Sequence, residues 1–319
     1  MANREYFLGI DGGGSKTTAV VFDENGNFIC SACGESINYY SVGLENARLA
    51  MTEIINSLSV KEYTCAFIGM SALNERASAA ETERFCSGVI KSELTVMDSD
   101  LFVALEAMNA QGECACIISG TGSMAVMRGT DGKISHTGGW GYILGDEGSG
   151  YAIGLSGIKA AIKSAENCAD ETALVGECLK YFSINNIYDL IDLYYEKKVS
   201  RKTTAAFARL VNKCAESGDK TAIAIIEAEA EELFRTAYGL LKSAKSDIPV
   251  GLWGGVFQNN LLFRKKFTAL AAEHGFSNVK LIDFTPEIGA VFAAYKLKGI
   301  DITENIINNI STTYIMPLM

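Results

Sequence analysis

The sequence is poor in residues that stiffen or cross-link a chain and in long apolar runs. Its 319 residues include three prolines, two tryptophans and two histidines. No run reaches the roughly 18 apolar residues that a membrane-spanning helix needs. The first residues, MANRE, are polar and lead directly into an apolar strand pattern, so they do not resemble an export signal. These absences predict a cytoplasmic protein without a membrane partner.

Positive charge is also scarce. The chain has 28 Lys and Arg against 38 Asp and Glu, which gives a net charge of -10. Nucleic-acid surfaces need clustered Lys and Arg, so no nucleic-acid partner is expected. The apolar fraction of 48% and charged fraction of 21% are ordinary for a globular protein. At about 150 residues per domain, this length predicts roughly two domains.

The cysteines and histidines do not suggest a metal site or a disulfide framework. Nine cysteines, an odd number in a long chain, are typical of buried thiols in a reducing compartment. Cys30 and Cys33 form a C-x-x-C pair, but no second pair follows at zinc-finger spacing. His136 and His274 lie far apart in the sequence. We expect all four to have packing or solvent-exposed roles.

A glycine-rich stretch near the start, GIDGGGSKTTAVVF, is the first candidate site. Its lysine comes one place too late for the G-x-x-x-x-G-K-[ST] phosphate loop. That loop and the dinucleotide fingerprint are both followed by a helix, whereas residues 17–22 are β-branched and apolar and favour a strand. The glycines therefore belong to the tip of a β-hairpin, where backbone N–H groups can bind an anion.

This hairpin pattern occurs twice. The stretch CIISGTGSMAVMRGTDGKIS again reads as strand, glycine-and-hydroxyl turn, strand, Asp-Gly turn and strand. Two such hairpins predict two similar domains whose glycine turns face a common cleft and clamp a polyphosphate. Elsewhere strands alternate with amphipathic helices, and the segment of about 156–245 is mainly helical. We predict an α/β fold with an N-terminal domain over 1–113 and a C-terminal domain over 114–319 that carries this helical insertion.

Four motifs in order resemble a known superfamily. GIDGGGSKT resembles the first phosphate motif, IISGTGS the second, and GLWGGVFQN the adenosine motif of the acetate and sugar kinases, heat-shock chaperones and actin. GGWGYILGDEGSGYAIG, residues 138–154, resembles a stretch in N-acetylglucosamine kinases and their relatives, the BadF-type ATPases. The resemblance covers nearly the whole chain. It implies two actin-like (ribonuclease H-like) domains facing across a nucleotide and sugar cleft, with ATP and Mg²⁺ as cofactors.

The resemblance assigns nucleotide-binding roles to three turns and a metal-binding role to one acid. Asp11 would hold Mg²⁺ through water, because a carboxylate beside the phosphates would otherwise repel them. Lys16 either neutralises phosphate charge or is simply solvated, and the glycine pair near residue 254 is also compatible with an ordinary strand-to-helix turn. The nucleotide-binding residues would be Gly12, Gly13, Gly14, Ser15, Lys16, Thr17, Gly120, Thr121, Gly122, Ser123, Gly254 and Gly255.

A kinase of this type also needs a base and a sugar site. Asp100 aligns with the catalytic base of the family, and Asp98 is the alternative; either could instead cap a helix. Trp140 would be exposed beside the sugar or buried in the core, and Asp146 would accept a hydrogen bond from a ring hydroxyl. The implied sugar-binding residues are Asn38, Ser71, Asp100, Gly138, Gly139, Trp140, Gly141 and Asp146.

The expected function is therefore an ATP-dependent amino-sugar kinase. The acceptor would be the 6-hydroxyl of N-acetylglucosamine or of a close relative such as glucosamine or N-acetylmuramate, which the sequence does not separate. The expected partners are this small sugar and a second copy of the chain. The alternative is a BadF-type ATPase that activates a partner enzyme through a cysteine-bound iron-sulfur cluster. A sugar sensor without catalysis is a third class, but it would be expected to lose the base.

Overall fold

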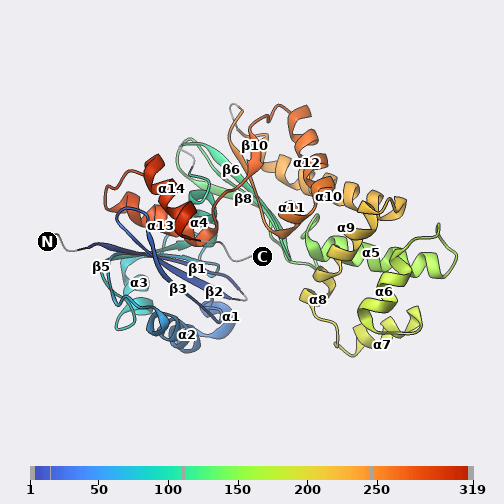
Figure 1. The fold of residues 1–319 in the computed structure, drawn as a ribbon, viewed down its shortest axis with the longest axis horizontal. Helices are drawn as coiled ribbons and strands as arrows, with labels where there is room; N and C mark the ends of the chain where they lie inside the picture. The colour runs from blue at the N-terminus through green and yellow to red at the C-terminus, as the bar shows by residue number, and fades with distance from the viewer. Residues whose placement is uncertain (1–3, 15, 110–111, 245–246, 315–319) are drawn as a thin grey trace. The chain divides into compact units, whose positions relative to one another are not determined.

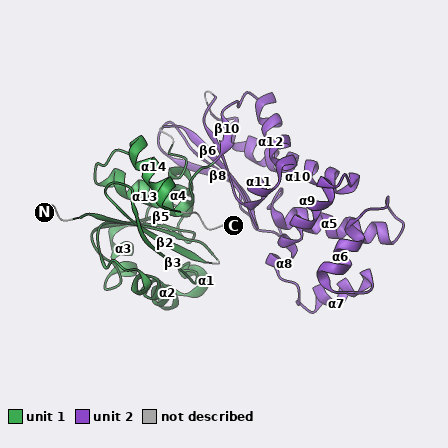
Figure 2. Cartoon of the chain, in the orientation of Figure 1, with its two compact units in different colours: residues 1–111, 282–319 green, residues 112–281 purple. Residues whose placement is uncertain are grey.

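The structure is a computed structural model that describes residues 4–14, 16–109, 112–244 and 247–314. The chain divides into two compact units (Figure 2). Unit 1 comprises residues 1–111 and 282–319, and unit 2 comprises residues 112–281. Each unit contains one five-stranded mixed sheet with helices packed against it (Figure 1). The predicted α/β class is confirmed.

Unit 1 has the strand order β3-β2-β1-β4-β5, in which β1, β4 and β5 are parallel and β2 and β3 are antiparallel to their neighbours. One sheet face packs against α2 and α3, and the other packs against α4, α13 and α14. The elements are β1 Tyr6–Gly12, β2 Thr17–Asp23, β3 Phe28–Gly34, α1 Tyr39–Val42, α2 Leu44–Ser57, β4 Glu62–Met70, α3 Ala79–Cys86, β5 Lys91–Ser99, α4 Asp100–Glu106, α13 Pro286–Leu297 and α14 Glu304–Thr313.

The last segment of the chain belongs to unit 1, which differs from the predicted domain that ran from 114 to 319. Helix α13 lies against β1 and α4. A Cβ atom at Gly289 would lie 2.0 Å from the carbonyl oxygen of Val103, so only glycine permits this close approach of the two helices. A buried helix with apolar residues on all sides, such as α13, has no amphipathic period that would show from the sequence which sheet it covers.

Unit 2 repeats the sheet of unit 1, with the order β10-β9-β6-β7-β8. Strands β6 and β7 form the antiparallel hairpin that corresponds to β1 and β2, as the internal repeat predicted. The elements are β6 Cys114–Ser119, β7 Ser123–Arg128, β8 Ile134–Gly138, α5 Gly150–Ala165, α6 Leu174–Phe182, the 3₁₀ helix η1 Ile187–Asp189, α7 Leu190–Tyr195, α8 Arg201–Ala206, α9 Ala208–Glu216, α10 Lys220–Leu241, β9 Val250–Trp253, α11 Gly255–Asn259, α12 Leu261–Glu273 and β10 Val279–Leu281.

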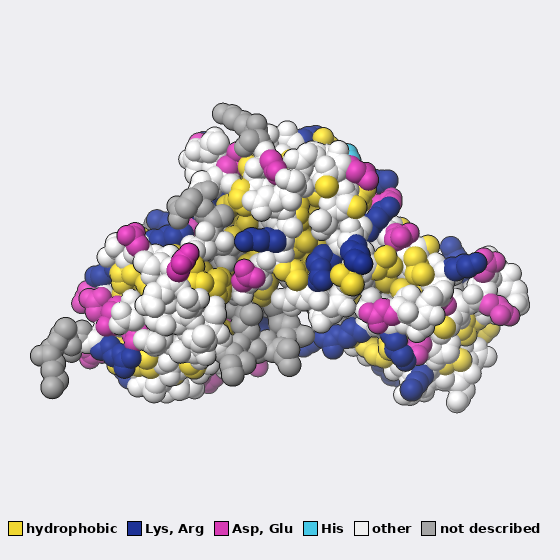
Figure 3. Space-filling model, turned by 45° about the horizontal axis from the view of Figure 1, so that its top comes forward, with side chains coloured by type: hydrophobic (Ala, Val, Ile, Leu, Met, Phe, Trp, Pro, Cys, Tyr) yellow, Lys and Arg dark blue, Asp and Glu magenta, His cyan; other side chains and the backbone are white. Residues whose placement is uncertain are grey.

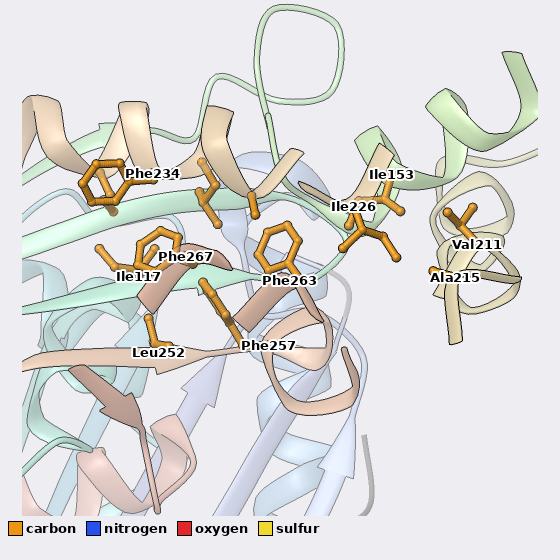
Figure 4. Packing of buried hydrophobic residues seen from close by; sticks show 14 of the residues in the cluster. Ile117, Ile153, Val211, Ala215, Ile226, Phe234, Leu252, Phe257, Phe263 and Phe267 are labelled. Carbon is orange, nitrogen blue, oxygen red and sulfur yellow. The ribbon is translucent and has the colours of Figure 1, made fainter. Parts of the chain in front are cut away.

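Aromatic side chains fill the core of unit 2. Phe257, Phe263 and Phe267 lie beneath α10 and against the sheet (Figure 4). Their rings meet edge to face, with centroids of Phe257 and Phe263 5.3 Å apart. His274 contacts the rings of Phe234 and Tyr238, which fits its predicted packing role.

The structure also bears on the predictions for surface charge, membrane-spanning helices and cysteines. Lys and Arg side chains lie among Asp and Glu on the face drawn in Figure 3. No helix among the described residues is long and apolar enough to cross a bilayer. All nine cysteines are free. Cys30 and Cys33 are three residues apart on β3, so their side chains lie on opposite faces of the strand and do not form a pair.

Candidate active site

The first glycine turn joins β1 to β2 in unit 1. The backbone N–H of Gly13 donates to the carbonyl of Lys16 over 3.0 Å, which closes the predicted hairpin tip. A Cβ atom at Gly14 would meet no atom within 4 Å, so the space beside this glycine is open to a ligand. The side chain of Lys16 is exposed. Ser15, also predicted to bind nucleotide, lies outside the described residues.

Two hydroxyl groups fasten this turn to the loop after β3. Thr17 Oγ1 donates to the carbonyl of Glu35 over 2.8 Å, and Ser36 Oγ donates to the carbonyl of Gly13 over 2.9 Å. Thr17 is fully buried. Its hydroxyl therefore stabilises the turn, whereas the sequence assigned it to the nucleotide.

Strand register brings the predicted acids to one edge of the sheet. Asp11 on β1 is aligned with Gly69 on β4, and Gly69 is aligned with Asp98 on β5. These strands are parallel, so their carboxyl ends lie at the same edge, where ligands of open α/β sheets bind. Asp100 follows directly as the first residue of α4.

Negative charge accumulates around Asp11. Burial, followed by the nearby charges of Glu287 and Asp100, raises the pKa of Asp11 to about 8, and Lys16 partly opposes this. Among the described residues, no group of three or more His, Cys, Asp or Glu side chains is arranged to bind a metal ion by itself. Mg²⁺ characteristically uses one or two carboxylates and completes its shell with water and phosphate oxygens. The donors around Asp11 therefore fit Mg²⁺ bound together with a polyphosphate.

The two candidate bases differ in their surroundings. Asp98 is 4% exposed, and its Oδ2 accepts from Arg76 Nε over 3.0 Å while its Oδ1 accepts from the N–H of Ser99 over 2.8 Å. Ser99, rather than either aspartate, caps α4 by accepting from the N–H of Phe102. Among the described residues, the Asp100 carboxylate makes no ion pair.

Burial also raises the pKa of Asp100 to about 6, although the backbone N–H groups of Leu101 and Asp100 itself lower it. A carboxylate with this pKa is still ionised at neutral pH and is a stronger base than an exposed aspartate. Its surroundings therefore support Asp100 over Asp98 for accepting a proton.

Two predicted sugar-binding residues meet in unit 1. Asn38 Nδ2 donates to Ser71 Oγ over 3.0 Å. Asn38 Oδ1 caps α1 by accepting from the N–H groups of Tyr40 and Ser41, which fixes the orientation of the amide. The N–H of Ser71 donates to the carbonyl of Gly12 over 2.9 Å, so this pair is tied to the first glycine turn.

The second glycine turn joins β6 to β7 in unit 2. The N–H of Gly120 donates to the carbonyl of Gly122 over 2.9 Å, and Thr121 between them is exposed. A Cβ atom at Gly120 would meet no atom within 4 Å. Ser123 is buried, and its hydroxyl donates to the carbonyl of Glu147 over 2.7 Å. Thr121 thus keeps a hydroxyl available to a ligand, whereas the Ser123 hydroxyl holds the adjoining loop.

The loop 138–148 contains the remaining predicted sugar residues. Trp140 is 74% exposed, so it is not part of the core. Asp146 is 3% exposed, and its Oδ2 accepts from Arg201 Nη2 over 2.6 Å. The Asp146 carboxylate, which was predicted to accept a hydrogen bond from a ring hydroxyl of the sugar, is thus already paired with Arg201. Left-handed glycines with φ between 74° and 79° shape the loop: Gly138, Gly139 and Gly141.

Gly254 lies between β9 and α11, and Gly255 is the first residue of α11. Gly254 has φ of 106°, and a Cβ atom there would lie 2.3 Å from the carbonyl oxygen of Ser119. Glycine at 254 is therefore required by the protein's own packing. Its role in binding adenosine stays a prediction.

Sequence reasoning missed two charged residues of these sites. Glu287 is 6% exposed in α13 and accepts from the hydroxyl of Tyr314 over 3.0 Å. It lies far from Asp11 in sequence, and only the fold of α13 onto β1 brings them together. Arg201 lies in a helical segment with no motif. No sequence signal links it to Asp146, whose burial only the structure shows.

Comparisons with known proteins identify the family and the fold of the chain. The model of the BadF/BadG/BcrA/BcrD ATPase family matches residues 8–294. An N-acetylmuramic acid/N-acetylglucosamine kinase of Clostridium acetobutylicum is 30% identical over 304 residues, covering 91% of this chain and 98% of the relative. An N-acetyl-D-glucosamine kinase of Dictyostelium discoideum is 27% identical over 319 residues, covering 93% and 99%.

Among solved structures, a candidate N-acetylglucosamine kinase from Chromobacterium violaceum has a TM-score of 0.70 at 19% identity. The match covers 90% of this chain and 98% of that one, and it shows a shared fold. The family model covers residues 8–294, which is most of the chain and shows its family. The protein belongs to the BadF/BadG/BcrA/BcrD ATPase family.

Proposed function

We propose that this protein is an ATP-dependent amino-sugar kinase. The γ-phosphoryl group of ATP would pass to the 6-hydroxyl of N-acetylglucosamine or of a close relative such as glucosamine or N-acetylmuramate. The observation that carries the proposal is Asp100, a carboxylate at the ligand-binding edge of the unit 1 sheet, outside any ion pair among the described residues and with a pKa raised to about 6. The names of the relatives with 27% and 30% identity support the same reaction.

The proposed chemistry assigns one step to Asp100. As the acceptor oxygen forms its bond to the γ-phosphorus, Asp100 accepts the hydroxyl proton, and the bond from phosphorus to the bridging oxygen of ADP breaks. The glycine turns contribute backbone N–H donors to the phosphate oxygens. Most of the rate enhancement in phosphoryl transfer comes from such alignment and charge neutralisation.

Asp11 is the proposed protein ligand of Mg²⁺, either directly or through water. When bound, the cation would neutralise charge on the β- and γ-phosphates. Burial, followed by the nearby charges of Glu287 and Asp100, raises the pKa of Asp11 because each disfavours its ionised form. The negative potential of these acids makes the edge of the sheet unfavourable for phosphates alone and favourable for phosphates carrying a divalent cation.

The sugar would be read by neutral hydrogen-bonding groups. The pair formed by Asn38 and Ser71 presents an oriented amide and hydroxyl, and a site built for hydroxyl groups rejects analogues that lack them. Trp140 offers an exposed ring for the apolar face of a sugar. Asp146 would contact a ring hydroxyl only with oxygen lone pairs that Arg201 leaves available.

A coupled assay of ADP release tests this proposal. The candidate acceptors are N-acetylglucosamine, glucosamine, N-acetylmannosamine, N-acetylmuramate and glucose, each compared with ATP alone. We expect at least one amino sugar to raise the rate well above the ATP-only background. If none does so, the kinase proposal is wrong.

The family name keeps one alternative open, an ATPase that activates a partner enzyme. Such an activator would need exposed cysteines that converge on an iron-sulfur cluster. Cys33 and Cys168 are exposed, one on β3 and one after α5. Iron and sulfide at stoichiometric amounts in protein purified without oxygen would favour the activator. We also propose a homodimer in the cytoplasm, and light scattering would test the mass.

A further inference from the structure

Arg201 is a charged residue of unit 2 for which the proposed reaction has no assigned role. It is the first residue of α8, which Ser200 caps by accepting from the N–H of Thr203. Two neighbours hold its guanidinium: Nη2 donates to Asp146 Oδ2 over 2.6 Å, and the ring of Tyr142 lies 5.3 Å from the guanidinium carbon. Such contacts from two sides fix the plane of the guanidinium.

The guanidinium lies beside the second glycine turn. A Cβ atom at Gly122 would lie 2.6 Å from Arg201 Nη2 and 2.8 Å from Asp146 Oδ2. Asp146 Oδ1 is also 3.4 Å from the backbone nitrogen of Ser123, the next residue of the turn. Glycine at 122 thus leaves room for the ion pair against the turn that is proposed to bind phosphate.

Close helix packing fixes the position of Arg201 relative to this turn. A Cβ atom at Gly154 would lie 2.1 Å from the carbonyl oxygen of Thr204, so α8 rests directly on the backbone of α5. At the start of α5, the N–H of Gly150 donates to the carbonyl of Gly120 over 2.7 Å. Short contacts therefore connect α8, through α5, to the second turn.

Arg201 has more hydrogen-bond donors than its ion pair with Asp146 uses. A guanidinium has five N–H donors, and the hydrogen bonds found among the described residues use only Nη2. The Arg201 side chain is 39% exposed, whereas that of Asp146 is 3% exposed. Nε and Nη1 thus form no hydrogen bond among the described residues, and part of the side chain is exposed. Phosphate oxygens match the planar donor geometry of arginine.

We propose that Arg201 donates hydrogen bonds to the phosphate groups of the nucleotide bound at the second glycine turn. The inference rests on the proposed use of ATP but not on the identity of the sugar. Asp146 and Tyr142 act as positioning residues that hold the guanidinium in place. The cation offsets phosphate charge in a chain whose net charge is -10.

Calorimetry of nucleotide binding without any sugar tests this role. Arg201→Met should weaken ATP binding by about tenfold or more, because a charge-assisted hydrogen bond contributes about 1.5–3 kcal/mol. Arg201→Lys should recover only part of the affinity, since a lysine lacks the planar fork. The matched control is Arg235→Met, which removes an exposed arginine paired with Glu232 on α10.

A second variant separates ligand binding from folding. Removing Arg201 leaves the buried Asp146 without its cation, which is destabilising. Asp146→Asn combined with Arg201→Met removes both charges and should restore thermal stability, while ATP binding stays weak. Wild-type ATP affinity in this folded double variant would overturn the proposal.

An acceptor comparison gives one more decisive outcome. If Arg201→Met binds ATP normally but raises the KM only for N-acetylmuramate, and not for neutral N-acetylglucosamine, the guanidinium reads an acceptor carboxylate and the proposal is wrong. Failure of the kinase proposal remains distinguishable. It would appear as the absence of sugar-dependent ADP release by the wild-type protein. The ATP affinities of the variants would still test whether Arg201 contacts phosphate.

Discussion

Replacing Asp100 by asparagine separates proton transfer from sugar binding. The amide can still hydrogen-bond the acceptor hydroxyl, so sugar affinity should stay within about tenfold of wild type. It cannot accept the proton, so the chemical step should slow by roughly 10²- to 10⁴-fold, the usual contribution of a general base. That loss corresponds to about 2.7–5.4 kcal/mol of transition-state stabilisation. Titration calorimetry and single-turnover rates measure the two quantities.

Asp98→Asn is the matched control. Asp98 is 4% exposed and accepts from Arg76 and from the N–H of Ser99. The change weakens a buried charge-assisted hydrogen bond, so the free energy of unfolding should fall by about 1–3 kcal/mol. The single-turnover rate should change little, since this carboxylate is already engaged. Full-speed Asp100→Asn, or a loss of rate confined to Asp98→Asn, would refute the assignment of the base.

Further predictions concern pH, metal and glycine. Because burial raises the pKa of Asp100 to about 6 and the ionised form is the base, kcat/KM measured at saturating Mg²⁺, which would keep Asp11 ionised, should fall with pH below about 6; a flat profile from pH 5 to 8 would contradict this. Asp11→Asn should keep the fold but shift the Mg²⁺ dependence of the rate to higher concentration by about tenfold, and an unchanged dependence would remove Asp11 from the site. Gly254→Ala should destabilise the protein by about 1–3 kcal/mol, because φ is 106° and the Cβ atom would strike Ser119. Gly14→Ala should have the melting temperature of the wild type, since its Cβ atom meets only open space. It should bind ATP more weakly, because the Cβ atom would enter the space proposed for the phosphates.

The elements and their repeat were predictable because they depend on local pattern. The β-branched run after the first glycine turn excludes a helix, and β1 and β2 form the expected hairpin. The repeat in sequence also predicted the hairpin of β6 and β7. The assignment of residues 282–319 was not predictable in this way, because α13 is buried on all sides and its partner is decided by close packing between Gly289 and Val103.

Side-chain roles within the sites followed the sequence less closely. Asn38 donates a hydrogen bond to Ser71, and their role in sugar binding stays a prediction. In contrast, Ser99 rather than an aspartate caps α4. The hydroxyl groups of Thr17 and Ser123, predicted to bind nucleotide, donate hydrogen bonds to neighbouring backbone carbonyls. Such hydrogen bonds depend on which loop lies beside the turn. A motif specifies the backbone conformation of that turn and leaves its surroundings open.

Contacts between segments that lie far apart in the sequence were also not predictable from the sequence. Asp146 appeared in the sequence as a sugar ligand, but its burial demands a cation, which Arg201 provides from a separate helix. Glu287 approaches Asp11 only after α13 packs on β1. The partner of Asp146 has a physical reason that becomes visible once burial is known, since a buried carboxylate needs a compensating cation, whereas Glu287 is a like charge that raises the pKa of Asp11.

The most direct test of the account is the stoichiometry of sugar phosphate to ADP. Phosphorus and carbon NMR of a reaction with the best acceptor of the ADP-release screen identify the product and the phosphorylated oxygen. The account predicts one 6-phosphorylated amino sugar for each ADP formed, and no such product with Asp100→Asn on the same time scale. Accumulation of ADP and inorganic phosphate without any phosphorylated sugar would contradict it and identify an ATPase.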